Sequence, residues 1–259
     1  MIDIHSHILF GVDDGAKTVE DSLELLKQAE QNGYTDIVCS SHFYIGRFEN
    51  ENYNKNFKIL KKRIKDENIK INIYKGNEVA FLDGALEKIK NINTINGTKY
   101  MLVEFKKGLL YPLYKGFLEK LINMGYIPVL AHIERYPFIK FEEFKELYKM
   151  GVVFQMNIKT VELLSPMMEY FLKNSYIKLV ATDTHNILRR NYDVGKNLKK
   201  LKNLVGEKSF LELTYENPKK ILNNEKINFE IKGESNEGKK INPSSNIFKF
   251  IWSKLFTRY

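Results

Sequence analysis

The histidines of this 259-residue chain stand where short apolar runs end, a position from which side chains can do chemistry. They are His5, His7, His42, His132 and His185. His5 and His7 belong to the pattern Asp3-x-His5-x-His7, and residues two apart on an extended segment point to the same side. Asp183-x-His185 repeats this spacing near the other end of the chain. Because imidazole is the commonest metal ligand, the spacing predicts that these side chains share metal ions.

Carboxylates occupy equivalent places. Glu78 follows one further apolar run and Glu104 ends another, and Asp13 and Asp14 lie in the loop after the first run. A charge at the end of an apolar strand is costly unless it is paired or binds a cation. Mixed imidazole and carboxylate ligands suit Mn²⁺, Fe²⁺ or Zn²⁺, and the ligands are too many for one ion. We therefore predict two or three ions, which lower the pKa of coordinated water and hold phosphate oxygens.

Cationic and hydroxyl groups stand beside these residues. Arg135 follows His132 by three positions, and Arg189 and Arg190 lie in the loop after the last histidine. Guanidinium forks match phosphate oxygens, although each arginine could instead form a surface salt bridge. Ser41 could donate a hydrogen bond to a substrate or cap a helix. The pattern as a whole favours phosphate-ester chemistry.

Short runs rich in Ile, Val, Leu and Tyr predict the strands that position these groups. They are Met1–Ile4, Ile37–Ser40, Ile71–Tyr74, Tyr100–Phe105, Ile127–Ala131, Val152–Met156 and Leu179–Ala181. Helices lie between them. Thr18 and Asp21 form a capping box, and proline opens later helices at Pro112, Pro166 and Pro218.

Alternating strands and helices imply parallel strands with right-handed crossovers. About seven such units without a hydrophobic break favour a closed α/β barrel of the TIM type over an open sheet. In such barrels the chemistry sits at the C-terminal ends of the strands, where the histidines and carboxylates of this sequence are expected.

Several other classes of protein fit less well. The chain has one cysteine, Cys39, so no intrachain disulfide can form. Ile45 lies six residues after Cys39 where a thiolate phosphatase loop needs arginine. No Gly-x4-Gly-Lys or Gly-x-Gly-x-x-Gly motif is present. The net charge of +9 could suit nucleic acid, but no nucleic-acid fold motif appears, and a solvated basic surface explains it as well.

Location is predicted from what the sequence lacks. No apolar run approaches the roughly 20 residues that span a bilayer. Asp3, His5 and His7 interrupt any apolar start, so no signal peptide is expected. The cytoplasm is therefore the default location. The C-terminal segment described next suggests a peripheral position at the inner face of the membrane as a further possibility.

The composition changes near residue 224. We expect a single domain over residues 1–224, a polar linker over 225–246 and a basic amphipathic segment over Ile247–Tyr259. As a helix, that segment places Phe248, Ile251, Trp252, Leu255 and Phe256 on one stripe. It suits an interfacial helix that tethers the protein to a membrane or a membrane-bound partner. The alternative is a helix that folds back on the barrel or joins two copies.

The chemistry-bearing motifs together resemble the PHP (polymerase and histidinol phosphatase) superfamily, in its bacterial tyrosine-phosphatase branch of the CpsB/CapC/YwqE type. The resemblance covers about Met1–Asn223. It rests on Met1-Ile2-Asp3-Ile4-His5-Ser6-His7-Ile8, Val12-Asp13-Asp14-Gly15, Ser40-Ser41-His42, Gly76-Asn77-Glu78, Val103-Glu104-Phe105, Ala131-His132-Ile133-Glu134-Arg135-Tyr136 and Thr182-Asp183-Thr184-His185-Asn186.

The resemblance implies a distorted (β/α)7 barrel with three metal ions, usually manganese. The implied ligand sets are His5, His7, Glu78 and Asp183 for one ion, Glu78, Glu104 and His132 for the second, and Asp14, His42 and His185 for the third. It also implies that Arg135 and Arg190 contact phosphate, with Ser41 as a further candidate. The implied substrate is the phosphotyrosine-rich tail of a membrane-associated tyrosine kinase that controls capsule or exopolysaccharide export.

Our leading hypothesis is therefore a manganese-dependent protein-tyrosine phosphatase. The second is a PHP-type phosphoesterase that acts on a small phosphorylated metabolite, and the third is a nucleic-acid binder or nuclease. Phe43 and Tyr44 bear on this choice, because they depart from the basic residues or histidines often found there in relatives. They could stack on a substrate ring or pack the loop.

Overall fold

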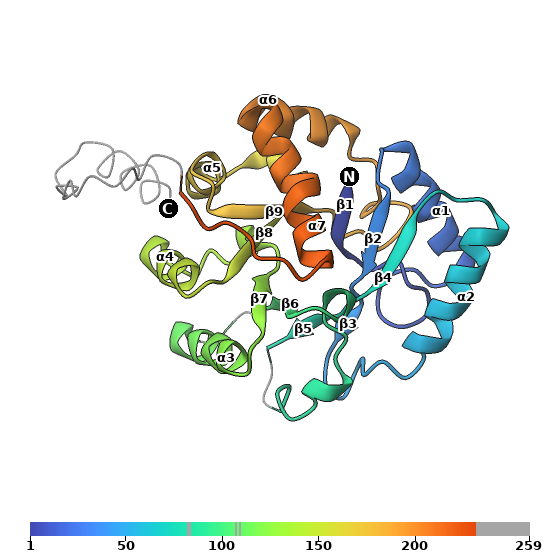
Figure 1. The fold of residues 1–259 in the computed structure, drawn as a ribbon, viewed down its shortest axis with the longest axis horizontal. Helices are drawn as coiled ribbons and strands as arrows, with labels where there is room; N and C mark the ends of the chain where they lie inside the picture. The colour runs from blue at the N-terminus through green and yellow to red at the C-terminus, as the bar shows by residue number, and fades with distance from the viewer. Residues whose placement is uncertain (82–83, 107, 109, 232–259) are drawn as a thin grey trace.

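The fold is described from a computed structural model, for residues 1–81, 84–106, 108 and 110–231 (Figure 1). All seven predicted strands are present, shifted by no more than two residues at either end. The strands are β1 (Ile2–Ser6), β2 (Asp36–Cys39), β3 (His42–Phe43), β4 (Asn72–Lys75), β5 (Glu78–Ala80), β6 (Tyr100–Glu104), β7 (Ile127–Leu130), β8 (Val153–Asn157) and β9 (Ile177–Ala181). The short strands β3 and β5 were not predicted.

Every pair of neighbouring strands is parallel. The pairing orders are β1-β2-β4 and β3-β5-β6-β7-β8-β9. Only two residues separate β2 from β3 and β4 from β5, so each pair acts as one interrupted strand that passes from the first sheet to the second. Asp183 N donates to His5 O (2.8 Å) and His7 N donates to Thr184 O (2.7 Å), which joins the end of β9 to β1. The pairing thus runs round seven strand positions and agrees with the predicted TIM-like barrel.

The helices surround this ring on the outside, as Figure 1 shows for α1 to α6. These helices are α1 (Val19–Gln31), α2 (Tyr53–Asp66), α3 (Tyr111–Asn123), α4 (Phe141–Lys149), α5 (Pro166–Lys173) and α6 (Gly195–Leu211). A further helix, α7 (Asn217–Leu222), lies at one end of the ring. The predicted capping box begins α1, since Asp21 N donates to Thr18 Oγ1 and Thr18 N donates to Asp21 Oδ2. The three predicted prolines lie in the first turns of α3, α5 and α7.

Two apolar layers hold the barrel together. The larger lies between strands and helices, and includes Leu25, Phe57, Phe144 and Phe171. The smaller fills the inside of the ring with residues such as Val38, Leu102, Val129, Val153 and Leu179, and Ile221 and Leu222 of α7 belong to it. The α7 helix therefore closes the end of the ring opposite to the strand ends that carry the chemistry.

Period-two alternation carries the inner face of several strands into the mouth of the barrel. Leu102 is an inner residue and Glu104 is two positions later. Ala181 is an inner residue and Asp183 follows it in the same way. The same strands that pack the interior therefore aim polar side chains at one place beyond it.

The chain stays on the domain through Ile231, past the boundary predicted at residue 224. Ile227 is buried with the inner cluster, and Phe229 packs beside Tyr148. Tyr100 Oη also donates to Glu225 O (2.7 Å). The first residues of the predicted linker pack because apolar residues alternate among the polar ones. The remainder of the linker and the predicted amphipathic segment Ile247–Tyr259 lie outside the described residues. Among the residues that the structure describes, no helix combines the length and apolar character needed to cross a membrane.

Candidate metal centre

The nine residues predicted as metal ligands meet at the C-terminal ends of the strands. Their donor atoms form four overlapping groups, and within each group the atoms lie within 4.8 Å of one another. The groups are His7, Asp14, His42 and His185; His5, Glu78 and His132; His5, His7 and Asp183; and His42, Glu78 and Glu104. Overlapping groups of mixed imidazole and carboxylate donors are the arrangement that a cluster of divalent cations requires.

Glu78 is the carboxylate at the centre. Its Oε2 atom lies 3.3 Å from His5 Nε2, 3.2 Å from His7 Nε2 and 3.1 Å from His42 Nδ1. Its Oε1 atom lies 2.8 Å from His132 Nε2. Glu78 begins β5, the short strand that the interruption at Gly76-Asn77 separates from β4. The interruption therefore places this carboxylate among four imidazoles.

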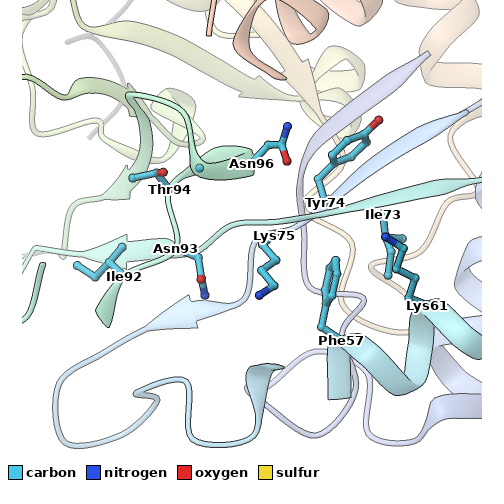
Figure 2. Close-up of a pocket in the computed structure, with 10 residues that line it drawn as sticks. Phe57, Lys61, Ile73, Tyr74, Lys75, Ile92, Asn93, Thr94 and Asn96 are labelled. Carbon is cyan, nitrogen blue, oxygen red and sulfur yellow. The ribbon is translucent and has the colours of Figure 1, made fainter. Parts of the chain in front are cut away.

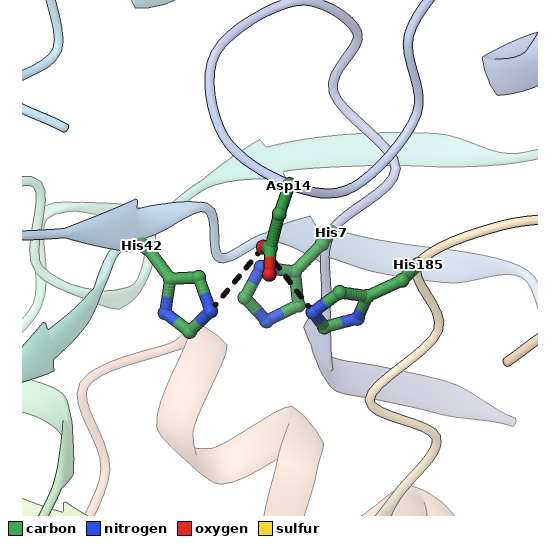
Figure 3. A group of neighbouring side chains, drawn as sticks. All are labelled: His7, Asp14, His42 and His185. Atoms are coloured by element: carbon green, nitrogen blue, oxygen red, sulfur yellow. Dashed lines mark ion pairs between the residues drawn. The ribbon is translucent and has the colours of Figure 1, made fainter. Parts of the chain in front are cut away.

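Asp14 completes the outermost group, shown in Figure 3. Its Oδ1 lies 3.4 Å from His42 Nε2 and 3.5 Å from His185 Nε2. The loop that carries Asp14 packs tightly, because a Cβ atom on Gly15 would lie 2.0 Å from His7 O. Glycine at this position lets the loop approach β1. The Asp14 side chain is 49% exposed, so the site opens to solvent on this side.

Most of the histidines are oriented by a neighbour that holds Nδ1. The contacts join His5 to Gln155 Oε1 (3.1 Å), His7 to Asp13 Oδ2 (2.7 Å), His132 to Tyr136 Oη (3.2 Å) and His185 to the carbonyl of Asp183 (3.0 Å). In each case Nε2 points at the carboxylates of the cluster. Metal-ligating histidines show this arrangement, in which an outer partner fixes the ring and frees the other nitrogen for the ion.

Polar atoms in the cluster are buried without a hydrogen bond among the described residues. They include Ser41 Oγ, His42 Nδ1 and His185 Nε2. Buried polar atoms in folded proteins are nearly always satisfied, and leaving one unpaired costs about 1–3 kcal/mol. These atoms and their chemistry fit divalent cations.

Burial and neighbouring charges shift the pKa values of the carboxylates and histidines in the cluster. Burial raises the pKa of Glu104 to about 7, and the neighbouring Glu78 carboxylate adds to the rise. Burial opposes charge on Glu78 as well, but the His5 and His42 imidazoles hold the pKa of Glu78 well below its ordinary value. Burial lowers the pKa of His185 to about 2, and repulsion from His7 acts in the same direction. Carboxylates crowded in this way are stabilised by bound cations.

Two of these residues have a backbone conformation that L-residues seldom adopt. His132 has φ 34° and Asp183 has φ 54°, both in the left-handed region. This region costs non-glycine residues roughly 1–2 kcal/mol and recurs at functional sites. Each residue lies two positions past the end of β7 or β9, so the unusual backbone turns the side chain just beyond the strand.

The two predicted phosphate-binding arginines converge on one carboxylate. Arg135 Nη2 lies 2.5 Å from Asp183 Oδ2, and Arg190 Nη2 lies 2.5 Å from Asp183 Oδ1. The two arginine side chains are 45% and 39% exposed, so they reach the centre from its solvent side. Arg189 is exposed, and its hydrogen bonds to the described residues come from its backbone, whose carbonyl accepts from Lys159 Nζ and whose amide donates to Asn186 Oδ1. Geometry therefore favours Arg190 over Arg189 as the second guanidinium of the site.

The residues around His42 differ in position. Ser41 is buried and begins no helix, which excludes the capping role, and its Oγ has no hydrogen-bond partner among the described residues. Phe43 is 1% exposed and packs in the outer core, so it cannot stack on a substrate. Tyr44 donates its hydroxyl to Glu104, and its ring contacts His42 and Phe48. Tyr44 and Phe48 are therefore the aromatic residues of this loop at the mouth.

A cavity of about 520 Å³ lies elsewhere, along α2 and β4 (Figure 2). Its lining includes Phe57, Lys61, Tyr74, Lys75, Asn93 and Asn96. Tyr74 Oη already donates to Asp36, and Asn96 Nδ2 donates to Leu222 O. Two polar side chains that line this cavity are therefore already hydrogen-bonded within the fold. The volume of the cavity alone does not make it an active site, so the metal centre remains the candidate functional site.

Some residues of the centre were not assigned a role from sequence. Asp13 accepts from His7 Nδ1, from His42 N (2.9 Å) and from Gly15 N (2.9 Å). Gln155 and Asn157 on β8 contact predicted ligands. Both lie at two-residue spacing from Val153, so the strand pattern placed them on the same face as this inner residue. Their residue type gave no hint of a metal site, because neutral amides are common in many other roles.

Comparison with known proteins agrees with the geometry. Residues 1–223 match the family described as capsular polysaccharide synthesis, CpsB/CapC. Tyrosine-protein phosphatase CpsB of Streptococcus agalactiae is 34% identical over 243 residues, which cover 88% of this chain and 100% of the relative. The putative tyrosine-protein phosphatase CapC of Staphylococcus aureus is 33% identical over 260 residues, which cover 93% of this chain and 98% of the relative.

A solved structure is similar over the same region. It comes from the crystal structures of YwqE from Bacillus subtilis and CpsB from Streptococcus pneumoniae, described as unique metal-dependent tyrosine phosphatases. The TM-score is 0.80 at 28% sequence identity, and the match covers 88% of this chain and 96% of that one. The barrel and the order of its strands are therefore those of a known architecture.

Proposed function

The chain belongs to the CpsB/CapC family of capsular polysaccharide synthesis, and from this we propose that it is a metal-dependent protein-tyrosine phosphatase. The observation that carries the proposal is the convergence of four donor groups and two guanidiniums at one end of the barrel. Donor groups of this kind suit hydrolysis of a phosphate ester, because both cations and guanidiniums attract its oxygens.

We propose that His5, His7, Glu78 and Asp183 hold one ion, that Glu78, Glu104 and His132 hold a second, and that Asp14, His42 and His185 hold a third. Manganese is the proposed metal. When bound, such ions would supply a nucleophile from water at neutral pH and offset charge on the phosphate. Glu78 faces members of all three sets, which makes it the proposed bridging carboxylate.

Arg135 and Arg190 are proposed to bind the phosphate oxygens. Both guanidiniums already reach one carboxylate, so their spacing suits a single small anion. They would stabilise the charge that the equatorial oxygens carry in the transition state. Tyrosinate is a good leaving group, so strong help from a general acid is not required.

We propose a phosphotyrosine protein as substrate, and a membrane-associated tyrosine kinase of capsule or exopolysaccharide synthesis as the partner. The family assignment and the names of the relatives support this choice. Contact with the membrane would depend on the predicted interfacial helix Ile247–Tyr259. That helix lies outside the described residues, so membrane contact stays a prediction from its sequence.

Replacing Arg135 by lysine is expected to lower kcat/KM for a phosphotyrosine peptide by about tenfold to a hundredfold. Lysine keeps the charge but cannot form the bidentate fork, and a hydrogen bond to a charged group contributes about 1.5–3 kcal/mol. Metal content should stay normal. The measurement is steady-state kinetics beside elemental analysis of the same samples.

Arg190→Lys should behave like Arg135→Lys, whereas the matched control Arg189→Lys should leave kcat/KM unchanged. An unaltered kcat/KM in Arg135→Lys would assign this arginine to an ion pair with Asp183 and nothing more.

Phosphotyrosine peptides should be hydrolysed faster than phosphoserine peptides of otherwise identical sequence. The ligands at the bottom of the mouth are buried, and a tyrosyl side chain carries its phosphate further from the peptide backbone than serine does. Tyr44 and Phe48 offer rings at the mouth, where aromatic contacts contribute about 0.5–1.5 kcal/mol each. The measurement is a comparison of kcat/KM on paired peptides.

A small phosphorylated metabolite serves as the reference substrate in that comparison. Equal rates on both peptides, with much faster turnover of the metabolite, would replace the tyrosine phosphatase by the small-molecule phosphoesterase.

A further inference from the structure

The β8 strand differs from β7 and β9 beside it, because amide side chains rather than a histidine or a carboxylate lie at its C-terminal end. Gln155 and Asn157 occupy the inward positions that histidines or carboxylates hold elsewhere. Both are buried, with exposed fractions of 0% and 6%. Burying two primary amides is costly unless every polar atom has a partner, so their contacts report what they do.

The orientation of the Gln155 amide is fixed by the backbone. His132 N lies 2.8 Å from Gln155 Oε1, and a backbone N–H can only donate. Oε1 is therefore the acceptor atom, and the same oxygen lies 3.1 Å from His5 Nδ1. Since Oε1 accepts, Nδ1 of His5 must carry a proton. In the neutral ring that leaves the lone pair on Nε2, which faces Glu78.

The Asn157 amide continues this order towards a carboxylate. Gln155 Nε2 donates to Asn157 Oδ1 (2.9 Å), so the nitrogen of Asn157 must point the other way. Asn157 Nδ2 donates to Asp183 Oδ2 (3.0 Å). Asp183 Oδ1 then faces the cluster, 3.5 Å from His5 Nε2 and from His7 Nε2. The two arginines reach the same carboxylate from the solvent side, Arg135 at Oδ2 and Arg190 at Oδ1.

We propose that Gln155 and Asn157 form an amide relay that fixes the tautomer of His5 and the orientation of Asp183 for metal binding. The relay donates in one direction, from His5 through the two amides to Asp183. The backbone of Asn157 is held separately, because Asn157 N donates to Glu134 Oε1 (3.2 Å). This inference rests on the proposed metal-dependent function, and it assigns positioning residues rather than ligands.

The test is the affinity of the metal-free full-length protein for Mn²⁺, measured by titration calorimetry without substrate. Gln155→Met keeps the size of the side chain but removes the acceptor, so affinity should fall about tenfold to a hundredfold, as for other outer partners of metal ligands. Gln155→Glu keeps an acceptor for His5, loses the donor to Asn157 and adds a negative charge, which itself favours a cation. It should therefore bind Mn²⁺ more tightly than Gln155→Met does.

Asn217→Leu is the matched control. Asn217 is also a buried amide, whose Nδ2 donates to Lys178 O (3.0 Å) at the opposite end of the barrel. Its replacement should lower thermal stability without changing Mn²⁺ affinity. With Zn²⁺ bound instead, the Nδ1 proton of His5 should be visible by NMR in the wild type and should exchange faster in Gln155→Met.

Wild-type affinity in folded Gln155→Met, or equal weakness in Gln155→Glu and Gln155→Met, would overturn the relay. Should Gln155→Met fail to fold, Asn157→Ala replaces it, and wild-type affinity there would have the same meaning. A wild type that binds no divalent cation would overturn the proposed function together with this inference. A wild type that binds Mn²⁺ but hydrolyses no phosphotyrosine would overturn the activity alone, and the order of affinities would still decide the relay.

Discussion

Removal of divalent cations is expected to lower phosphotyrosine hydrolysis to the uncatalysed rate, and added Mn²⁺ to restore it. The barrel mouth gathers histidines and carboxylates, and among the described residues no serine hydroxyl is hydrogen-bonded to a histidine ring. Cys39 is buried on β2 with its pKa raised by burial. Bound cations would supply the largest share of rate enhancement in such a site. The measurement is activity after chelation and desalting, followed by titration with Mn²⁺, Fe²⁺ and Zn²⁺.

The restoration of activity by Mn²⁺ should depend on pH, because histidine ligands bind a cation only after they lose a proton. Burial alone would lower the pKa of His7, but the Asp13 carboxylate raises it well above its ordinary value. A cation at this ring therefore competes with a proton more strongly than it would at an ordinary histidine. Apparent affinity for Mn²⁺ should therefore weaken as the pH falls from about 8 to about 6, with protons released on binding. Full activity in excess chelator, with no metal found by elemental analysis, would exclude the mechanism.

Replacing Glu78 by glutamine is expected to lower kcat by at least about two orders of magnitude, which corresponds to about 2.7 kcal/mol. The substitution keeps the size of the side chain and removes one negative charge. Glu78 is 1% exposed and faces four imidazoles within 3.3 Å, so no other side chain can take its place. The bound metal per chain should fall in parallel.

Glu134→Gln is the matched control for this experiment. Glu134 is also a carboxylate near the mouth, and burial raises its pKa to about 7. Its Oε1 accepts from Asn157 N and from Thr160 Oγ1, and a glutamine oxygen can accept both bonds. Metal content and kcat should stay near those of the wild type. Comparable losses in both variants would mean that general disturbance of the mouth, and not loss of the bridging charge, explains the result.

The strands could be located from sequence because their signals are local. Runs such as Tyr100–Phe105 and Val152–Met156 are apolar on both faces, as strands between a packed interior and a layer of helices must be. Caps and first-turn prolines marked the helices in the same way. The interruptions that create β3 and β5 had no such mark, because two residues of irregular backbone fall below the length over which periodicity can be recognised.

The residues of the candidate site also divide into those that local sequence could indicate and those that only the packed structure could place. Residue type and position at a strand end were enough to predict that His5, His7, Glu78 and Asp183 lie together, since few other arrangements suit these side chains there. Phe43 and Tyr44 are adjacent in the same short strand and its exit, yet one packs in the core and the other reaches the mouth. Alternation places them on opposite faces, but only the packed barrel determines which face is the core.

The sequence by itself therefore determined the order of strands and helices and the kinds of side chain at the strand ends. Closure of the barrel decided which of those side chains meet. Gln155 contacts His5 across 150 residues of sequence, and Asp13 contacts the backbone of His42 across 29. Asn157 meets Asp183 only because β8 and β9 are neighbours. Hydrogen bonds of this kind depend on distances of a few ångströms between segments whose local patterns carry no information about one another, so they appear only in the tertiary structure.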